Sequence, residues 1–132
     1  MSVLIGLHIK RVLANVEAVT RMVGNRIYPL VVPQGVDTFP FICYDMNGGM
    51  GDSTKDGVVD DVASVNISVI AKSYEEAITI GNAVRYAFEG KRAEYEEFSV
   101  TECMNVAYND EYIDALDCYA VNLSMDFRTE DY

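Results

Sequence analysis

Cysteine and histidine are scarce in this sequence of 132 residues, which holds three cysteines and one histidine. The cysteines are odd in number and widely spaced, and no two have CxxC spacing, so neither a disulfide framework nor a zinc site is expected. Cys43 and Cys118 lie in apolar, strand-like stretches, where a buried and unreactive thiol is the usual interpretation. His8 lies in a helix-like pattern without a nearby cysteine, which favours a core residue over a ligand or base.

Positive charge is scarce as well. Ten lysines and arginines face 21 aspartates and glutamates, which gives a net charge of −11. Residues 1–44 hold four basic and two acidic residues (+2), and residues 45–132 hold six basic and 19 acidic ones (−13). A chain without a basic stripe is not expected to bind nucleic acid or anionic membranes. Its surface suits a basic partner, or a passage to which DNA must not adhere.

Long apolar runs are missing from the sequence. None approaches the roughly 18 apolar residues that a membrane-spanning helix needs. Residues 1–11 place their charge after their apolar residues, which is the wrong order for a secretory signal. Half of the residues are nevertheless hydrophobic, enough for a packed core. The length predicts one domain over residues 1–132, and we expect a soluble, intracellular-type protein.

Recognisable catalytic motifs are also missing. The sequence has no GxSxG, no HExxH and no Cys/His pair with a third partner, and its glycine-rich stretch 47–57 lacks the GK[ST] of a phosphate loop. One acidic segment lacks the spacing and glycine of an EF-hand, which favours a solvated edge over a calcium or magnesium site: Asp110, Glu111, Asp114 and Asp117. We expect no catalytic, cofactor-binding or metal-binding residue. A metal-dependent hydrolase built on these four acids is the least favoured alternative.

The clearest pattern that is present lies between residues 61 and 90. Apolar and polar residues alternate from Ala63 to Lys72, the period of two that is typical of a strand with one buried face. Ser73 and Glu76 have the spacing of a capping box, which predicts the start of a helix. The following apolar and small residues recur at three- and four-residue steps: Tyr74, Ala77, Ile78, Gly81, Val84 and Phe88. Gly90 is expected to end this helix.

The rest of the chain predicts one more helix and four more strands. The helix spans residues 5–23 and ends at Gly24-Asn25, and the strands are expected at 26–32, 39–46, 98–108 and 119–127. Pro29 favours either an edge position for the first strand or an interruption of it. The stretch Asn47–Gly57 has little to bury and is expected to be a flexible loop or a long hairpin tip. The order α-β-β-β-α-β-β predicts an α+β fold, a mostly antiparallel sheet with two helices packed on it.

Two parts of the sequence carry a recognisable combination of segments. The first part holds RIYP at 26–29, PQG at 33–35, and FPF at 39–41 with Tyr44, and the second holds the strand 65–69 with Ser73–Ala77 and Asn82–Arg85 after it. The first part resembles the front half of a known family, the tail-completion (tail-to-head joining) proteins of long-tailed phages and prophages, also catalogued as a domain of unknown function. The second part resembles that family's strand and second helix, at the expected distance. The resemblance covers roughly residues 1–90 and fits the element order.

The resemblance implies a structural, non-enzymatic role without cofactors. Such proteins form a ring, commonly six-fold, at the head-proximal end of the tail tube, where it joins the tail to the head connector. The implied partners are further copies of this chain, tail-tube proteins and head-connector proteins. The implied locations are the host cytoplasm during assembly and then the virion tail. A purified monomer is compatible with this role, because assembly can require the partners.

A ring subunit needs an exposed edge or loop for a head-to-tail contact that closes. The candidate assembly loop lies in and just after the glycine-rich stretch, with these charged residues: Asp52, Lys55, Asp56, Asp60 and Asp61. Acidic residues of 45–132 that faced the lumen of the ring would repel passing DNA. An alternative of another class is an acidic DNA mimic that inhibits a nucleic-acid enzyme, which requires closely spaced carboxylates on one continuous face and a basic partner.

Overall fold

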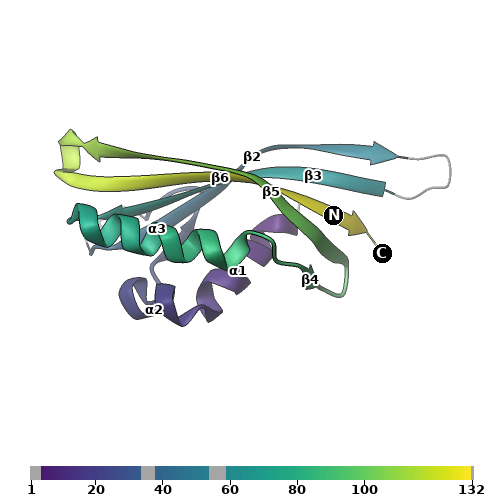
Figure 1. Cartoon of the computed structure of the whole chain (residues 1–132), viewed down its shortest axis with the longest axis horizontal. Helices are drawn as coiled ribbons and strands as arrows, with labels where there is room; N and C mark the ends of the chain where they lie inside the picture. Colours follow the sequence, from purple (N-terminus) through teal and green to yellow (C-terminus); the bar gives the residue numbers. More distant parts are fainter. Residues whose placement is uncertain (1–3, 34–37, 54–58, 132) are drawn as a thin grey trace.

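The computed structural model describes residues 4–33, 38–53 and 59–131 (Figure 1). In this described part the chain forms three α-helices and one six-stranded sheet. The helices are α1 (Ile5–Asn15), α2 (Glu17–Val23) and α3 (Tyr74–Phe88). The strands are β1 (Ile27–Pro29), β2 (Phe41–Ser53), β3 (Val59–Ala71), β4 (Ala93–Glu94), β5 (Phe98–Ile113) and β6 (Cys118–Asp131), and a short 3-10 turn, η2 (Asp114–Leu116), joins β5 to β6.

The strands lie in the order β1-β2-β3-β6-β5-β4. The four long strands are antiparallel to their neighbours, and only the short β1 pairs in parallel, with β2. Figure 1 shows the helices together on one side of the sheet, and the β2–β3 and β5–β6 hairpins extending toward opposite ends of the molecule. The predicted α+β class and mostly antiparallel sheet are confirmed, whereas the predicted count of two helices and the predicted element order are wrong.

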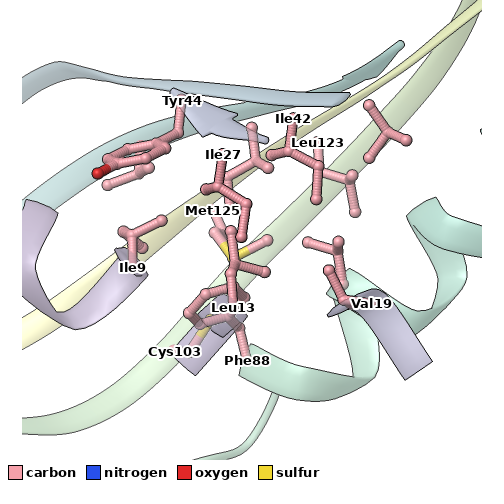
Figure 2. Close-up of a cluster of buried hydrophobic side chains, with 14 of the residues drawn as sticks. Ile9, Leu13, Val19, Ile27, Ile42, Tyr44, Phe88, Cys103, Leu123 and Met125 are labelled. Carbon is pink, nitrogen blue, oxygen red and sulfur yellow. The ribbon is translucent and has the colours of Figure 1, made fainter. Parts of the chain in front are cut away.

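The core lies between the helices and one face of the sheet (Figure 2). Every second residue of β3 from Ala63 to Ala71 is buried, and the residues between them are partly exposed, as the alternation predicts. The helices contribute Ile9 and Leu13 from α1 and Phe88 from α3, which pack into the same cluster. Since apolar burial is the main favourable term in folding, this single layer holds the helices on the sheet.

Helix α3 begins and ends where the sequence predicts. Ser73 adopts an extended conformation, and its hydroxyl accepts a hydrogen bond from the backbone N–H of Glu76 at 3.4 Å. Gly90, just beyond the helix, has φ +73°, the left-handed region that favours glycine. Between these ends Gly81 lies against β6, and a Cβ at this position would lie 2.8 Å from Val121 Cγ1. Glycine therefore sets how closely α3 approaches the sheet.

The predicted helix over residues 5–23 is interrupted at Val16. This residue is extended (φ −95°, ψ 110°), and its carbonyl accepts the N–H groups of Val19 and Thr20, so that it starts α2 as it ends α1. A β-branched residue is rotamer-restricted in a helix and favours the extended region. The break changes the direction of the chain, so both short helices place apolar residues against the core. Periodicity alone could not distinguish one helix from two.

The glycine-rich stretch is a strand along much of its length. β2 continues to Ser53 and pairs with β3, with Gly51 opposite Asp61 and Asp52 opposite Asp60. The expected loop over 47–57 is therefore wrong for residues 47–53, and the alternative of a long hairpin is confirmed there. A bulge between Met46 and Gly48, where Gly48 has φ +131°, accommodates the change in register. Residues 54–58 lie outside the described residues.

The second hairpin is also longer than predicted. β5 continues past the predicted strand end at residue 108 to Ile113, and the chain reverses at η2, where Asp117 adopts a left-handed conformation with φ 48°. β6 extends past the predicted strand end at residue 127 to Asp131, and β4 was not expected. At the other side of the sheet, the edge position expected from Pro29 is confirmed, since β1 is a terminal strand.

Candidate assembly surface

His8 is a core residue, as expected. It is 2% exposed, its Nδ1 lies 2.6 Å from the hydroxyl of Tyr95, and its ring makes edge contacts with Phe88 and Phe127. Burial lowers the pKa of His8 from 6.5 to about 4. The imidazole is therefore neutral near pH 7 and joins α1 to the segment before β5, a structural role.

The three cysteines are free thiols rather than a reactive group. Cys118 is buried as expected, whereas Cys43 is only partly buried, a correction to the expectation, and its thiol lies 3.6 Å from the carbonyl of Leu30. Cys103 is buried as well, and burial raises its pKa to about 12. Burial also raises the pKa of Cys43 and Cys118. A raised pKa removes thiolate at neutral pH, which is the opposite of what a nucleophilic cysteine needs.

The acidic segment 110–117 does not converge on one point. Asp110 accepts a hydrogen bond from the Tyr74 hydroxyl of α3 at 2.6 Å, whereas Glu111 accepts one from Asn122 of β6 at 3.1 Å. Asp117 accepts from the hydroxyl of Tyr112. These partners lie on both sides of the sheet, because neighbouring residues of a strand point to opposite faces. In the described part of the chain no three histidine, cysteine or acidic side chains are grouped as a metal site would require.

A groove of about 480 Å³ runs between the exposed face of α3 and the far half of β5. Tyr74 and Arg85 line it from the helix, and Tyr108 and Asp110 line it from the strand. Arg85 lies over the ring of Tyr108 at 5.0 Å and also contacts Glu89 at 2.5 Å. The bond to Asp110 raises the pKa of Tyr74, since ionising the phenol would place two negative charges together. The groove has aromatic walls, formed by Tyr74 and Tyr108.

The middle of the other face of the sheet carries a network of small polar side chains, and one end of that face carries Phe41 beside Ile70. Ser64 donates to Asp126 at 2.6 Å, Ser68 to Asn122 at 2.8 Å, and Asn66 to Asp45 at 3.1 Å. Each of these bonds joins neighbouring strands, so the network connects β2, β3 and β6. Because the helices cover only the opposite face, this polar face is open to solvent in the monomer.

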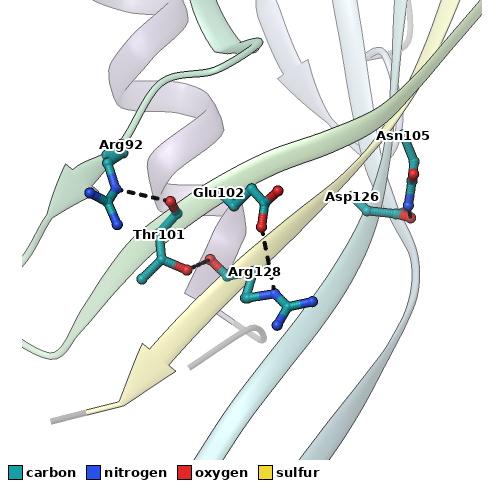
Figure 3. Close-up of polar contacts among 6 residues, drawn as sticks. All are labelled: Arg92, Thr101, Glu102, Asn105, Asp126 and Arg128. Carbon is teal, nitrogen blue, oxygen red and sulfur yellow. Dashed lines mark hydrogen bonds and ion pairs between the residues drawn. The ribbon is translucent and has the colours of Figure 1, made fainter.

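Bulges and polar contacts shape the near half of β5, as Figure 3 shows. The register with β6 shifts between Val100 and Glu102 and again between Met104 and Ala107. Across the first shift, the Thr101 hydroxyl donates to the carbonyl of Arg128 at 3.2 Å, and the Arg128 guanidinium lies 3.9 Å from Glu102. Near the second, Asn105 donates to Asp126 at 2.9 Å. These contacts hold β5 on the sheet even though β4 covers little of its outer side.

Both outer sides of the sheet are open over most of their length. β1 pairs with β2 only at residues 42–44, and one further bond joins Leu30 N–H to Tyr44 O. β4 pairs with β5 only at residues 99 and 100, and Arg92 caps the carbonyl of Thr101. Within the described residues, no strand pairs with the outer edge of β2 after Tyr44 or with that of β5 after Thr101. An unpaired edge is a template for another strand.

The two edges differ in the sign of the charged side chains beside them. The segment from Phe98 to Asp117 contains five acidic residues and no lysine or arginine. Beside β1, in contrast, Lys10 donates to the carbonyl of Ile27 at 3.1 Å, and Arg26 precedes the strand. The β5 side is therefore acidic, and the β1 side carries basic groups.

The candidate assembly-loop residues lie at the far end of the β2–β3 hairpin. Asp52 belongs to β2, and Asp60 and Asp61 belong to β3, with Asp52 paired to Asp60. Lys55 and Asp56 lie outside the described residues. The open edge of β5 was not expected from the sequence. Its signal was weak, because the exposed tyrosines Tyr108 and Tyr112 alternate with Asn109 and Glu111 without an apolar face.

The fold of the chain is similar to that of a chain in a solved structure. A chain in the solved structure of the virion of a native gene transfer agent particle superimposes with a TM-score of 0.75 at 18% sequence identity, covering 92% of this chain and 91% of that chain. No curated protein sequence matches the chain. None of the helices in the described ranges has the length and apolar character needed to cross a membrane.

The sequence itself then identifies the family. The chain belongs to the family described as Tail completion protein gp17, whose model matches residues 8–130. The resemblance noted in residues 1–90 is thereby confirmed and extends through β5 and β6. Membership of this family supports a structural phage tail protein.

Proposed function

We propose that this chain forms a ring at the head-proximal end of the tail tube and joins the tail to the head connector. Membership of the tail-completion family over residues 8–130 is the observation that carries the proposal. The geometry agrees with it, because the described chain presents docking surfaces and no reactive centre. Two different open edges on opposite sides of one sheet suit a head-to-tail contact between copies, and such contacts form rings when the rotation closes.

In the proposed ring, the helices face outward and the polar face of the sheet faces the lumen. A sheet that curves with its helices on the convex side leaves them room, whereas the concave side would crowd them. The polar face would then offer DNA hydroxyl and amide groups, with carboxylates such as Asp45 and Asp126 among them. The net charge of −11 acts in the same direction, since it repels phosphate.

From the sequence, the segment with Asp52, Lys55, Asp56, Asp60 and Asp61 was the candidate for the contact between copies; we propose instead that it contacts the next layer of the tail or the connector. Changing Asp56, Asp60 and Asp61 together to Asn should impair tail joining or slow DNA ejection. The matched control changes three acids of the α3–β5 connection, Glu94, Glu96 and Glu97, to Gln, and should leave both unchanged. Equal behaviour of the two triple variants would overturn the assignment of the hairpin end.

The distribution of acids disfavours the DNA-mimic alternative. Asp110 and Glu111 bond to groups on opposite sides of the sheet, and other acids lie at the start of α3 and in the connection to β5. A mimic needs its carboxylates on one continuous face. The metal-dependent hydrolase has no converging acids in the described residues to support it.

Removing the gene from its phage or prophage and restoring it in trans tests the proposed function. Particles made without the chain should accumulate as DNA-filled heads and separate tails, and the chain supplied in trans should restore joined particles. Electron microscopy counts the three species directly. Normal joined particles in the absence of the chain would contradict the proposal.

A further inference from the structure

We propose that neighbouring copies join by antiparallel pairing of the outer edge of β5 in one copy with the outer edge of β2 in the next, so that the sheet continues from copy to copy. This inference rests on the proposed ring and specifies its junction. The partner is a second copy of this chain, and the backbone groups that pair are those of residues after Thr101 in β5 and after Tyr44 in β2.

Strand direction fits this junction. β2, β3, β6 and β5 alternate in direction, so the first and the last of these four strands run in opposite directions. Rotation about an axis along the strands preserves the direction of every strand. β5 of one copy would therefore meet β2 of the next in antiparallel orientation, and the alternation would continue around the ring. An odd number of alternating long strands would have given a parallel junction.

Apolar side chains lie beside both edges and on the same face of the sheet. Tyr108 faces α3 from β5 and is 64% exposed. Met46 of β2 lies opposite the buried Val65, so it is also on the helix side, and it shares a small apolar groove with Leu30, which is 72% exposed. When the two edges pair, these side chains come together on one side of the junction and lose contact with water.

Charge favours pairing between different edges over pairing between like edges. Two β5 edges would bring Glu102, Asp110 and Glu111 against the same acids of the partner, and like charges across a strand pair are destabilising. Pairing β5 with the β1–β2 side instead brings one end of this acidic strand near Lys10 and Arg26. The acids that it meets on β2 itself are Asp45 and Asp52. The contact is therefore head-to-tail, the kind that closes into a ring.

Cysteine cross-linking in assembled particles tests the junction. Met46→Cys is combined in turn with Val106→Cys, Tyr108→Cys or Asp110→Cys, which samples the register at positions expected on the helix side of β5. A disulfide forms only where Cβ atoms approach to about 4 Å. At least one double variant should give, on a non-reducing gel, a ladder of covalent oligomers that ends at the ring size, whereas each single variant should run as the monomer.

Two control pairs retain Met46→Cys and place the second cysteine where the proposed junction does not bring it near residue 46. Asn109→Cys lies on the opposite face of β5, and Tyr86→Cys is an exposed position of α3, so neither pair should give a ladder. The wild-type chain reports any background from its three native thiols. Dimers from single variants would show like edges in contact and would overturn the proposal. So would particles that contain the chain and join normally but give no ladder with any pair.

Hydrogen–deuterium exchange on the wild-type chain gives a second readout that needs no variant. Backbone amides of residues 45–53 and 102–113 should exchange at least tenfold more slowly in assembled particles than in the monomer. Unchanged exchange at both edges in particles that contain the chain would overturn the junction and leave the proposed function standing. Absence of the chain from joined particles would instead refute the proposed function, and the junction with it.

Discussion

At the residue scale, single positions fix how the helices meet the sheet. His8 holds α1 against the segment before β5 through its bond to Tyr95 and its contacts with the surrounding rings. Gly81 allows α3 to lie directly on Val121. The sequence assigned His8 to the core correctly, but the close approach at Gly81 could not be predicted, because it depends on a residue forty positions away.

Acid should weaken the fold through His8. Its pKa is 6.5 in the unfolded chain and about 4 in the folded one, so between these values the unfolded chain binds a proton that the folded chain does not. The stabilisation is complete above about pH 6.5 and is lost as the pH falls toward 4, with an upper bound of about 3 kcal/mol. Urea unfolding across this range measures the slope.

His8→Phe is the matched control for this pH dependence. The phenyl ring retains the contacts with Phe88 and Phe127 but cannot be protonated, and Tyr95 is exposed enough to exchange its bond for water. The variant should show a flatter loss of stability between about pH 6.5 and 4, with only the carboxylates contributing. Identical slopes for the two proteins would contradict a depressed pKa at His8.

Gly81→Ala should destabilise the protein although alanine favours helices. The added Cβ would lie 2.8 Å from Val121 Cγ1 and 3.3 Å from its Cβ, so either α3 or β6 has to move. We expect a loss of about 1–3 kcal/mol, against a helix-propensity gain of about 1 kcal/mol. Asn82→Ala, at the exposed neighbouring position, should be neutral or stabilising. Thermal unfolding of both variants decides, and a more stable Gly81→Ala protein would contradict the close contact.

At the element scale, the start of α3 shows how far a local capping motif determines where a helix begins and how stable it is. Ser73→Ala removes the hydroxyl that accepts the Glu76 N–H and should cost about 1 kcal/mol. Ser73→Asp keeps an acceptor at the same place and should retain most of the stability, aided by the helix dipole. Denaturant unfolding of the three proteins compares them directly. Equal stabilities for Ser73→Ala and wild type would show that the cap contributes nothing.

Sequence patterns predicted elements well where one face is buried and poorly where neither is. β3 and α3 each have a clean period, and the buried face of β3 and the ends of α3 were predicted correctly, although β3 begins at Val59 rather than at Ala63. The outer parts of β2 and β5 lack such a period. There, pairing with a neighbouring strand satisfies the backbone and outweighs the low strand propensity of glycine, asparagine and aspartate. The break at Val16 escaped prediction for the opposite reason, because apolar spacing continues through both helices.

At the scale of the whole molecule, the sheet has two open edges, a covered face and a polar face. The sequence predicted the antiparallel sheet with helices on it, and the resemblance predicted the family. It did not predict the edges, because strand order depends on contacts between distant segments: β6 lies between β3 and β5. The assembly surface that the sequence placed in a loop therefore extends, in our proposal, to both outer edges of the sheet. The end of the β2–β3 hairpin is one part of that surface.

A cryo-EM map of the joint between tail tube and head connector, taken from particles that carry this chain, tests the central claim most directly. Density for this fold should appear as one closed ring at the head-proximal end of the tube, with its helices outside and the polar face of its sheet toward the DNA. A map that shows the chain at the distal tip of the tail or in the capsid shell, or no copy of it in joined particles, would contradict the account.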